Sequence, residues 1–423
     1  MKPSDRRFFL AAGAAAMTQT SFGADEVRVG MIGMGGRGNA LLKDVKNVPN
    51  ARVTHLCDVD QSRLERAQTA AAGLGYGQVR GSADLRRVLE DKNVDAVVVA
   101  TPDHWHAPAA ILACIAGKDV YVEKPVSHNL REGRLIVDVA RKYSRVVQAG
   151  MQSRSRASTI KAVELAHSGK LGKVLMAKAW NSQLRADIGK KTNSGIPPGI
   201  DFDTWIGPAD VMPFNENRFH YKWHWNWNFG TGDMGNDGAH QLDQARWALG
   251  VDLPKRVGGM GAKYFFQDDQ QTPDTMNISF DYGGKGLIWE MRIWHEYGLE
   301  GIDNGVSVYG TEGFLHMGRW NRKWGYRYFD KKEKIVEEYQ GTDDSEAAHM
   351  KNFVECVISR KRPNCDIEIG HLSSALCHLG NIVHRTGRNV AFNPANESIP
   401  GDAEANALLK RKYRNHWAAP KGA

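Results

Sequence analysis

Residues 33–38 have the types and spacing needed to bind a phosphate group: Gly33-Met34-Gly35-Gly36-Arg37-Gly38. Glycines let the backbone turn tightly and approach a pyrophosphate, and a helix that begins there offers unpaired N–H groups and partial positive charge. An apolar run at 27–32 is expected to form the preceding buried strand, and a helix is expected from residue 39 onward. This order predicts that residues 33–38 bind a dinucleotide; a glycine-rich turn that binds nothing is the alternative.

Asp58 follows the next expected strand, residues 51–57, and completes the dinucleotide-binding pattern. An acid at this position accepts hydrogen bonds from the adenosine ribose and repels a 2′-phosphate. Asp60 adds to that repulsion. We therefore expect the cofactor to be NAD, and Arg63 is the one residue that would support NADP instead.

Two more polar segments follow expected strands of the same region. Thr101-Pro102-Asp103-His104-Trp105-His106-Ala107-Pro108 is expected to be a shaped loop, with Thr101, Pro102 and His106 near the cofactor. The alternative is that Trp105 packs and the histidines cap the following helix. Glu123-Lys124-Pro125 is also expected beside the cofactor, where a lysine can hold a substrate hydroxyl and shuttle its proton. A structural ion pair of Lys124 is the alternative, and the bond to the proline is a candidate for the cis form.

The elements that carry these segments alternate between helix and strand as far as residue 147. Helices are expected at 85–90, 108–116 and 131–143, and strands at 96–101, 120–122 and 146–149. This alternation predicts a doubly wound parallel sheet of the α/β class, with its ligand crevice at the carboxyl ends of the strands. The segments described above all fall at such ends, which favours one shared site.

The pattern changes after a helix expected at 159–168. Strands are expected in succession at 174–180, 256–265, 276–282, 286–293 and 305–309, with helices at 240–249, 347–358 and 372–384. We therefore predict a C-terminal α+β domain with a mainly antiparallel open sheet. The expected boundaries are 25–147 for the Rossmann NAD-binding domain, 148–390 for the substrate-binding domain and 391–423 for a C-terminal extension.

The combination of these motifs resembles the glucose–fructose oxidoreductase/inositol dehydrogenase family (Gfo/Idh/MocA). The resemblance covers residues 27–388 and includes Tyr309-Gly310-Thr311-Glu312-Gly313. It implies that Lys124, the lysine of the E-K-P motif, is catalytic. The family's second signature, D-x-G-x-H, corresponds to Asn236-Asp237-Gly238-Ala239-His240, so the resemblance implies that His240 is the catalytic histidine.

Asn236 departs from the family pattern, which has an aspartate at that position. Asn236, His240 and Asp243 would share one face if a single helix carried them. An asparagine can orient an imidazole but cannot stabilise its charged form, so either Asp237 or Asp243 compensates or the site performs different chemistry. We predict that Asn236 orients His240; a role for Asn236 or Asp237 as a helix cap is the alternative.

The segment Phe219-His220-Tyr221-Lys222-Trp223-His224-Trp225-Asn226-Trp227-Asn228-Phe229 is dense in aromatic rings and polar donors. Such surfaces stack against sugar rings and bond hydroxyl groups. We expect His220, Tyr221 and Trp223 to contact substrate together with Lys124, Asp237 and His240, while oligomer contact or core packing is the alternative. The histidine spacing supports no metal site.

The first 24 residues are expected to be a twin-arginine signal peptide, with Arg6 and Arg7 before an apolar stretch and small residues near Ala24. An anchor that is never cut is the alternative. The formal charge of +8 and the basic stretch 410–414, expected to be a solvated tail, come with no nucleic-acid motif. The five cysteines indicate neither a zinc site nor a disulfide framework; a Cys365–Cys377 bridge is conceivable.

Three functions compete. The first is an exported, periplasmic NAD-dependent oxidoreductase, expected to form a homo-oligomer, that transfers a hydride between tightly bound cofactor and a hydroxyl carbon of a sugar or polyol. The second is a glycoside hydrolase that acts by transient oxidation and elimination; related exported proteins often have a valine in place of the lysine, so Lys124 favours the dehydrogenase. The third, a binding protein without catalysis, conflicts with the presence of Asp58, Lys124 and His240.

Overall fold

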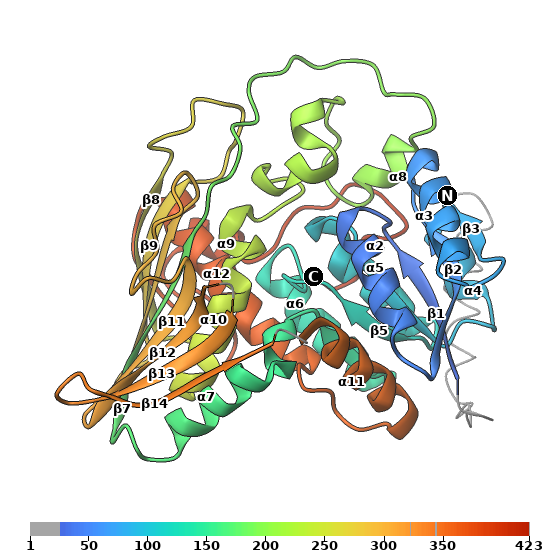
Figure 1. The fold of residues 1–423 in the computed structure, drawn as a ribbon. Helices are drawn as coiled ribbons and strands as arrows, with labels where there is room; N and C mark the ends of the chain where they lie inside the picture. Colours follow the sequence, from blue (N-terminus) through green and yellow to red (C-terminus); the bar gives the residue numbers. More distant parts are fainter. Residues whose placement is uncertain (1–25, 322, 343–344, 423) are drawn as a thin grey trace.

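The computed structural model describes residues 26–321, 323–342 and 345–422. Two sheets stand side by side, with the N-terminal sheet drawn in blue and the C-terminal sheet in yellow and orange (Figure 1). The chain that leaves β7 (Val174–Ser182) arches over the top of both before it enters the short helix α8 (Phe202–Ile206). The two sheets are therefore bridged by backbone at the edge where the predicted site residues lie.

The N-terminal sheet is parallel and has the strand order β3-β2-β1-β4-β5-β6. Its strands are β1 (Val27–Ile32), β2 (Ala51–Cys57), β3 (Arg80–Ser82), β4 (Ala96–Val99), β5 (Asp119–Val122) and β6 (Val147–Ala149). Its helices are α2 (Gly36–Lys46), α3 (Gln61–Gly73), α4 (Leu85–Glu90), α5 (Asp103–Ile115) and α6 (Leu130–Lys142). The strand order is that of a doubly wound dinucleotide-binding sheet, so the predicted fold class is confirmed.

One expectation for this sheet is wrong. The segment 101–108 was expected to be a loop, but α5 begins at Asp103, with Pro102 as its N-cap residue. Pro108 lies inside the helix, which is buried along almost its whole length. Pro108 is the sixth residue of this helix, so its missing N–H removes one hydrogen bond of the second turn, and burial of the whole segment supplies the packing that favours the helix in spite of this loss.

The C-terminal sheet has the order β14-β13-β12-β11-β7-β10-β9-β8-β15 and is antiparallel except where β10 lies parallel to β7. Its other strands are β8 (Arg256–Ala262), β9 (Thr275–Asp281), β10 (Gly286–Arg292), β11 (Asn304–Gly310), β12 (Gly313–Trp320), β13 (Lys323–Asp330), β14 (Ile335–Gly341) and β15 (Val390–Ala391). Strands β3 and β12 to β14 had not been predicted. Of these, β14 has no buried residue, and β13 contains Lys323, Arg327 and Asp330, which weakens the hydrophobic signal that sequence reasoning uses.

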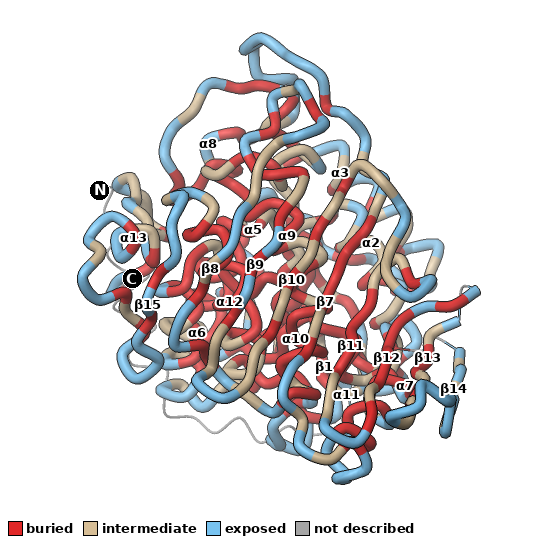
Figure 2. The backbone as a smooth tube through the Cα atoms, turned by 90° about the vertical axis from the view of Figure 1, so that its left-hand side faces the viewer, coloured by how far each residue is buried: buried red, intermediate tan, exposed pale blue. Residues whose placement is uncertain are grey.

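Helices cover one face of the C-terminal sheet. They are α7 (Ala157–His167), α10 (Gly238–Leu249) and α12 (Ile367–Thr386), while α11 (Ser345–Ser359) packs near α2. Along β9 the residues Met276, Ile278 and Phe280 are buried, whereas Asn277 and Ser279 between them are exposed. The same alternation is visible along neighbouring strands in Figure 2, so one face of the sheet forms the core and the other is open.

The basic stretch 410–414 is not a solvated tail, contrary to expectation. Arg411 donates to Asn228, the Tyr413 hydroxyl donates to Glu132, and Arg414 pairs with Asp203. Three of the five side chains of this stretch thus bond into the protein, an arrangement that its charge alone could not reveal. All five cysteines are buried and free. No helix among the described residues is long and apolar enough to span a membrane.

Candidate active site

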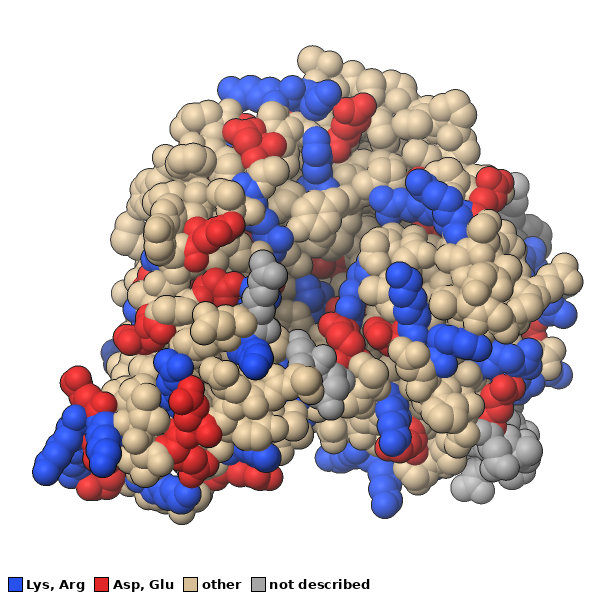
Figure 3. Space-filling view, viewed as in Figure 1, with Lys and Arg blue, Asp and Glu red and all other residues tan. Residues whose placement is uncertain are grey.

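A cleft of about 580 Å³ runs along the carboxyl edge of the N-terminal sheet and reaches Asn236 in the C-terminal half. In the space-filling view the surface is hollowed between the two halves, and charged side chains of both signs surround the hollow (Figure 3). Most of the predicted site residues line this cleft, namely Gly33, Gly35, Gly36, Arg37, Asp58, Thr101, Pro102, His106, Glu123, Lys124, His220, Tyr221, Trp223 and Asn236. Met34, Gly38, Asp237 and His240 are not part of its lining.

The glycine turn fits a dinucleotide. Gly33 has φ +89°, and a Cβ there would lie 2.7 Å from the carbonyl oxygen of Ala100. A Cβ on Gly38 would lie 2.0 Å from the carbonyl oxygen of Gly33, so this glycine lets α2 pack against the turn. A Cβ on Gly36, in contrast, would meet nothing within 4 Å. The N-terminus of α2, which has no side-chain cap, therefore opens onto empty space that a pyrophosphate can fill.

Asp58 lines the cleft at the carboxyl end of β2. Its carboxylate accepts hydrogen bonds from the N–H groups of Met34 (2.7 Å) and Asp60 (2.9 Å), which fixes both the turn and the end of β2. Arg63 lines the same end of the cleft, and its guanidinium would lie 2.9 Å from a Cβ on Gly35. Arg63 thus lies close to the glycine turn and faces the carboxylates of Asp58 and Asp60.

Arg37 is held by two carboxylates. Its Nε donates to Glu123 Oε1 and its Nη2 donates to Glu346 Oε2, each at 2.7 Å. Burial disfavours the charged form of Glu123, but the cations of Arg37 and Lys124 lower its pKa to about 2. Glu123 is therefore ionised at neutral pH and links the end of β5 to α2 and α11.

Lys124 is fixed by Asn236. Its Nζ donates to the backbone carbonyl of Asn236 at 2.7 Å and to the side-chain Oδ1 at 2.9 Å, across 112 positions of sequence. The bond between Lys124 and Pro125 is cis. Lys124 and Asn236 both line the cleft, so the N-terminal and C-terminal halves of the chain contribute one residue each to the same point.

The expected contact between Asn236 and His240 is not made. Helix α9 (Gly232–Asn236) ends at Asn236 and α10 begins at Gly238, so the two residues do not lie on one continuous helix face. Among residues 26–321, 323–342 and 345–422, the His240 imidazole has no hydrogen-bond partner. Burial, together with the charge of Lys124, lowers the pKa of His240 to about 4, so the ring is neutral at pH 7.

Neither neighbouring acid bonds to the His240 ring, although the charge of Asp237 opposes the lowering of its pKa. Asp243 is fully buried and binds Arg154 and Ser373. Asp237 is the N-cap residue of α10 but makes no side-chain cap bond, and it pairs with Arg185 instead. The capping role considered for Asn236 and Asp237 is therefore absent as well.

Sequence reasoning missed a buried acidic group beneath the cleft. Arg185, which follows β7, donates to Asp233 at 3.0 Å and to the Tyr221 hydroxyl at 3.0 Å. Burial and the charge of Asp237 raise the pKa of Asp233. The Asn236 amide donates to Asp233 at 3.2 Å, so this cluster lies directly behind the residue that holds Lys124. No spacing in the sequence connects Arg185 with residues 233–237.

His106 and Thr101 form the wall of the cleft at the start of α5. The ring nitrogens of His106 lie 2.6 Å from the carbonyl of Pro125 and 2.8 Å from that of Thr101, so the ring ties these two segments together. The Thr101 hydroxyl is buried and has no partner among the described residues, which leaves it free for a ligand in the cleft. His104 instead contacts the carbonyls of Trp205 and Phe229 and lies away from the lining.

The aromatic segment divides between two roles. Phe219 and Phe229 are buried in a cluster with Phe202, Trp205 and Phe214. His220, Tyr221, Trp223 and His224 line the cleft on the other side. Core packing and a ligand-facing surface are thus both present in the segment, and we call residues 199–229 the cover because they lie over the nucleotide end.

Two family models match this chain. One, described as an oxidoreductase family with an NAD-binding Rossmann fold, matches residues 27–151. The other, described as the C-terminal alpha/beta domain of the oxidoreductase family, matches residues 173–287 and 324–419. The chain belongs to the Gfo/Idh/MocA oxidoreductase family. Its N-terminal sheet is an NAD-binding domain, and its cofactor is NAD.

The relatives that match this chain are named as two kinds of enzyme. A scyllo-inositol 2-dehydrogenase (NAD(+)) from Bacillus subtilis (strain 168) is 25% identical over 346 residues, covering 80% of this chain and 88% of that protein. A glycosyl hydrolase family 109 protein 2 from Shewanella sp. (strain ANA-3) is 38% identical over 134 residues, covering 31% of this chain and 29% of that protein. Matches to several such hydrolases span less than half of their length.

Solved structures share the fold. The aldose-aldose oxidoreductase from Caulobacter crescentus superposes with a TM-score of 0.67 at 18% identity and covers 87% of this chain and 100% of its own. The WlbA dehydrogenase from Bordetella pertussis, solved with NADH and UDP-GlcNAcA, gives a TM-score of 0.66 at 18% identity. At this identity the likeness shows the fold alone.

Proposed function

We propose that this protein is an exported NAD-dependent oxidoreductase that transfers a hydride between a hydroxyl carbon of a sugar or polyol and a tightly bound nicotinamide. The observation that carries the proposal is the position of Lys124: its ammonium lines the cleft and is aimed by two bonds to Asn236. The similarity to the inositol dehydrogenase over most of both chains supports a polyol substrate.

NAD, when bound, supplies the hydride acceptor. Lys124 is placed to donate a hydrogen bond to the substrate hydroxyl and hold its oxygen in one position. His240 is neutral at pH 7 because its pKa is about 4, so we assign it the role of accepting the hydroxyl proton. Asn236 keeps Lys124 directed into the cleft, and we assign it this positioning role in place of the orientation of His240.

The cover supports the proposal that the cofactor stays bound. Gln61 N–H donates to the carbonyl of Gly199 at 2.9 Å, and Asp201 N–H donates to that of Val59 at 3.0 Å. The ring nitrogen of His220 lies 3.3 Å from Asp60. These contacts tie residues 199–220 to the adenosine side of the cleft, so dinucleotide release requires part of the cover to move.

Retention of the cofactor suits export, because free dinucleotide is not expected outside the cytoplasm. The twin-arginine segment lies outside the described residues, and export remains our proposal. Replacing Arg6 and Arg7 together by Lys should keep the protein in the cytoplasm with its NAD bound. Unchanged export of that variant would contradict the route. The expected homo-oligomer is a separate proposal, which light scattering of the mature protein tests.

One experiment tests the oxidoreductase directly. The purified protein is examined by mass spectrometry for bound dinucleotide, and then mixed with inositols, hexoses and aryl glycosides while nicotinamide absorbance and aglycone release are followed. We expect bound NAD and net reduction of it by a polyol. Protein that carries no dinucleotide, or bound NAD that no polyol reduces, counts against the proposal.

The partial similarity to glycosyl hydrolase family 109 proteins favours a second candidate. In that reaction a ring hydroxyl is oxidised, the neighbouring C–H becomes acidic, the aglycone is eliminated, and the oxidation is then reversed. Aglycone release without net NADH formation would select this function. Lys124 weighs against it, because related hydrolases often have a valine at the corresponding position.

A further inference from the structure

A second cavity, of about 550 Å³, lies between part of the cover and residues 191–193 and 269–271, and it shares no lining residue with the NAD cleft. Every residue in its lining is polar: Lys191, Thr192, Asn193, Asn215, Asn217, Arg218, Asn226, Asp269 and Gln271. Five of these nine side chains are carboxamides, the groups that proteins commonly use to bond hydroxyl and carboxylate oxygens. No function described above uses this cavity.

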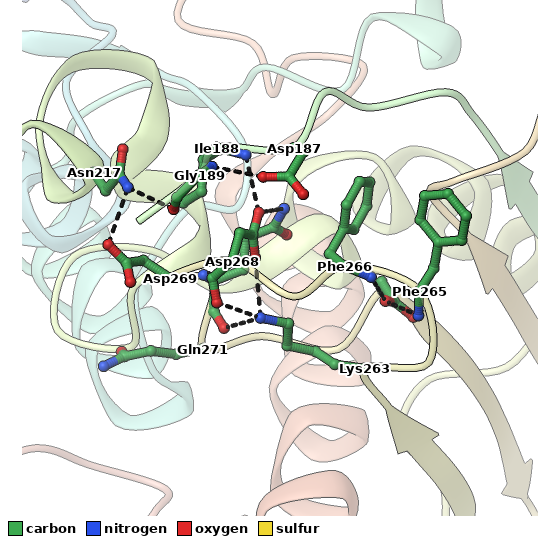
Figure 4. Close-up of polar contacts among 12 residues, drawn as sticks. Asp187, Ile188, Gly189, Asn217, Lys263, Phe265, Phe266, Asp268, Asp269 and Gln271 are labelled. Atoms are coloured by element: carbon green, nitrogen blue, oxygen red, sulfur yellow. Dashed lines mark hydrogen bonds and ion pairs between the residues drawn. The ribbon is translucent and has the colours of Figure 1, made fainter. Parts of the chain in front are cut away.

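The walls of the cavity are rigid. Asp268, whose side chain is 1% exposed, accepts bonds from Ile188 N–H (2.9 Å) and Lys263 Nζ (3.0 Å). Asn217 donates to the Gly189 carbonyl (2.8 Å) and to Asp269 (3.0 Å), as drawn in Figure 4. Asp187–Lys191 is therefore fastened to residues 263–271, and the cavity between them exists before any ligand arrives.

The amide oxygens of the lining are already satisfied. Backbone N–H groups donate to Asn215 Oδ1 (2.8 Å), Asn226 Oδ1 (3.0 Å) and Gln271 Oε1 (2.9 Å). Because an N–H group can bond only to the oxygen of an amide, these contacts also fix which end of each amide is the NH₂ group. Asn193 Oδ1 accepts from Arg218 and Asn215.

Several donors, in contrast, have no partner among the described residues. These are the NH₂ groups of Asn193, Asn226 and Gln271, and the remaining N–H groups of Arg218 beyond one bond of 3.4 Å to Asn193. Asn226 is only 4% exposed as a residue, and its unpaired NH₂ group keeps some accessible surface, so it is a donor that a ligand in the cavity can reach. In Figure 4 the Gln271 side chain likewise makes no contact with the other residues drawn.

The charged side chains of the lining differ in whether they have a partner. Lys191 pairs with Glu216 at 3.3 Å, whereas Arg218 makes no ion pair among the described residues. Asp269 uses one oxygen, Oδ2, to accept from Lys191 N–H and Asn217, and its Oδ1 has no donor within the described chain. The cavity thus presents one guanidinium and several amide donors, together with a single free carboxylate oxygen.

We propose that this cavity is a second carbohydrate-binding site, separate from the NAD cleft, and that it takes a sugar acid such as a uronic acid residue. The carboxylate of the sugar is bonded by Arg218 and by amide NH₂ groups, and a ring hydroxyl donates to Asp269 Oδ1. A bare inorganic anion fits less well, since it has no hydroxyl to offer and faces the charge of Asp269. A neutral sugar leaves Arg218 without its counter-charge.

The test uses the full-length protein with its bound dinucleotide, titrated by calorimetry with glucuronate, glucose and sodium sulfate at one ionic strength. We expect glucuronate to bind at least ten-fold more tightly than glucose or sulfate. Arg218→Ala should weaken glucuronate binding about 10- to 100-fold, which is the usual effect of losing a charge-assisted bond. Asn193→Trp should abolish binding by filling the cavity. Lys190→Ala changes an exposed neighbour outside the lining and should leave binding unchanged.

Four outcomes would overturn the proposal. These are no glucuronate binding by the native protein, equal binding of glucose, equal binding of sulfate, and binding that survives both Arg218→Ala and Asn193→Trp. Bound dinucleotide is measured in every sample. A protein that retains NAD but binds no glucuronate therefore refutes this site without touching the oxidoreductase proposal.

Discussion

Replacing Lys124 by methionine tests the core of the active-site assignment. Methionine keeps most of the side-chain length but removes the ammonium that lines the cleft. Two acceptors on Asn236, at 2.7 and 2.9 Å, then lose their donor. The change should therefore act on stability and on turnover, by amounts that can be separated.

The stability effect is small. Leaving partly buried acceptors unpaired costs about 1–3 kcal/mol. For a chain of 423 residues, an unfolding entropy of about 2.1 cal/mol/K per residue converts this to a fall in Tm of about 1–4 °C. The effect on turnover is larger, since loss of a positioned proton-handling group typically costs about 10²–10⁴ in rate. That loss corresponds to about 3–5 kcal/mol in the barrier.

Lys118→Met is the matched control. Lys118 Nζ also donates to two carbonyl oxygens, those of Asp91 and Val94, each at 2.8 Å, and it does not line the cleft. The two variants lose the same kind of bonds, so their Tm values should fall by similar amounts. Only Lys124→Met should lose turnover.

The assay measures bound dinucleotide, Tm and single-turnover reduction of NAD by the best polyol of the panel. We expect both variants to retain NAD and only the Lys124 variant to be slow. Full turnover in Lys124→Met would refute the assignment. An equal loss in Lys118→Met would show that lost stability, and not lost chemistry, explains the effect.

Three further predictions concern the same cleft. His240→Gln should lose about 10²–10⁴ in rate. On the acid side, kcat/KM of the native enzyme should fall only as the pH drops through about 4, where His240 becomes protonated. This acid limb of the pH–rate profile should be absent in the variant. Gly38→Ala should prevent stable folding because its Cβ would clash with backbone at 2.0 Å, whereas Gly36→Ala, with nothing within 4 Å, should fold normally, as circular dichroism would show. Gly207→Ala, with φ +56° and a Cβ 2.4 Å from the Trp105 ring, should loosen the cover and speed NADH release several-fold in a stopped-flow chase.

Much of the N-terminal half could be predicted because its signals are local. The glycine turn, Asp58 and the E-K-P segment each follow a short buried strand, and the parallel topology brings strand ends together. The family match to residues 27–151 confirms the fold that these signals indicated. The predicted start of α5 was wrong. Pro108 indicated that the helix begins there, but the helix begins at Asp103 because the whole segment is buried.

The C-terminal half shows what sequence spacing could not supply. Arg185 reaches Asp233 across 48 positions, and Lys124 reaches Asn236 across 112. Side chains of ordinary type make both contacts. The first depends on how the C-terminal half folds, and the second depends on how the two halves are placed. The same is true of the cover, where one face of the aromatic segment packs in the core and the other lines the cleft.

Asn236 is the residue at which this chain departs from the family pattern, and its contacts indicate what an aspartate would do there. Its amide NH₂ lies 3.2 Å from Asp233 Oδ1 and 3.5 Å from Asp237 Oδ2. Asn236→Asp would replace this donor by a third carboxylate. With an effective dielectric constant of about 20, the repulsion from Asp233 at 3.2 Å and Asp237 at 3.5 Å is about 10 kcal/mol in total, and the ammonium of Lys124, 2.9 Å from the replaced oxygen, offsets about 6 kcal/mol of it before any proton is taken up. The cluster should relieve this repulsion by binding a proton.

The consequence has a definite sign. A carboxyl group whose pKa is raised on folding stabilises the fold at low pH, and that stability is lost as the pH rises through the raised value. The Tm of Asn236→Asp should therefore approach that of the native protein near pH 5 and fall progressively below it towards pH 8. The added charge should also raise the pKa of His240 and move the acid limb of the rate profile to higher pH. Asn236→Ala is the control, because it removes the bonds without adding charge, and its Tm deficit should be nearly constant over the same range. A deficit in Asn236→Asp that is equally independent of pH would show that Asn236 does not lie against Asp233 and Asp237 in solution.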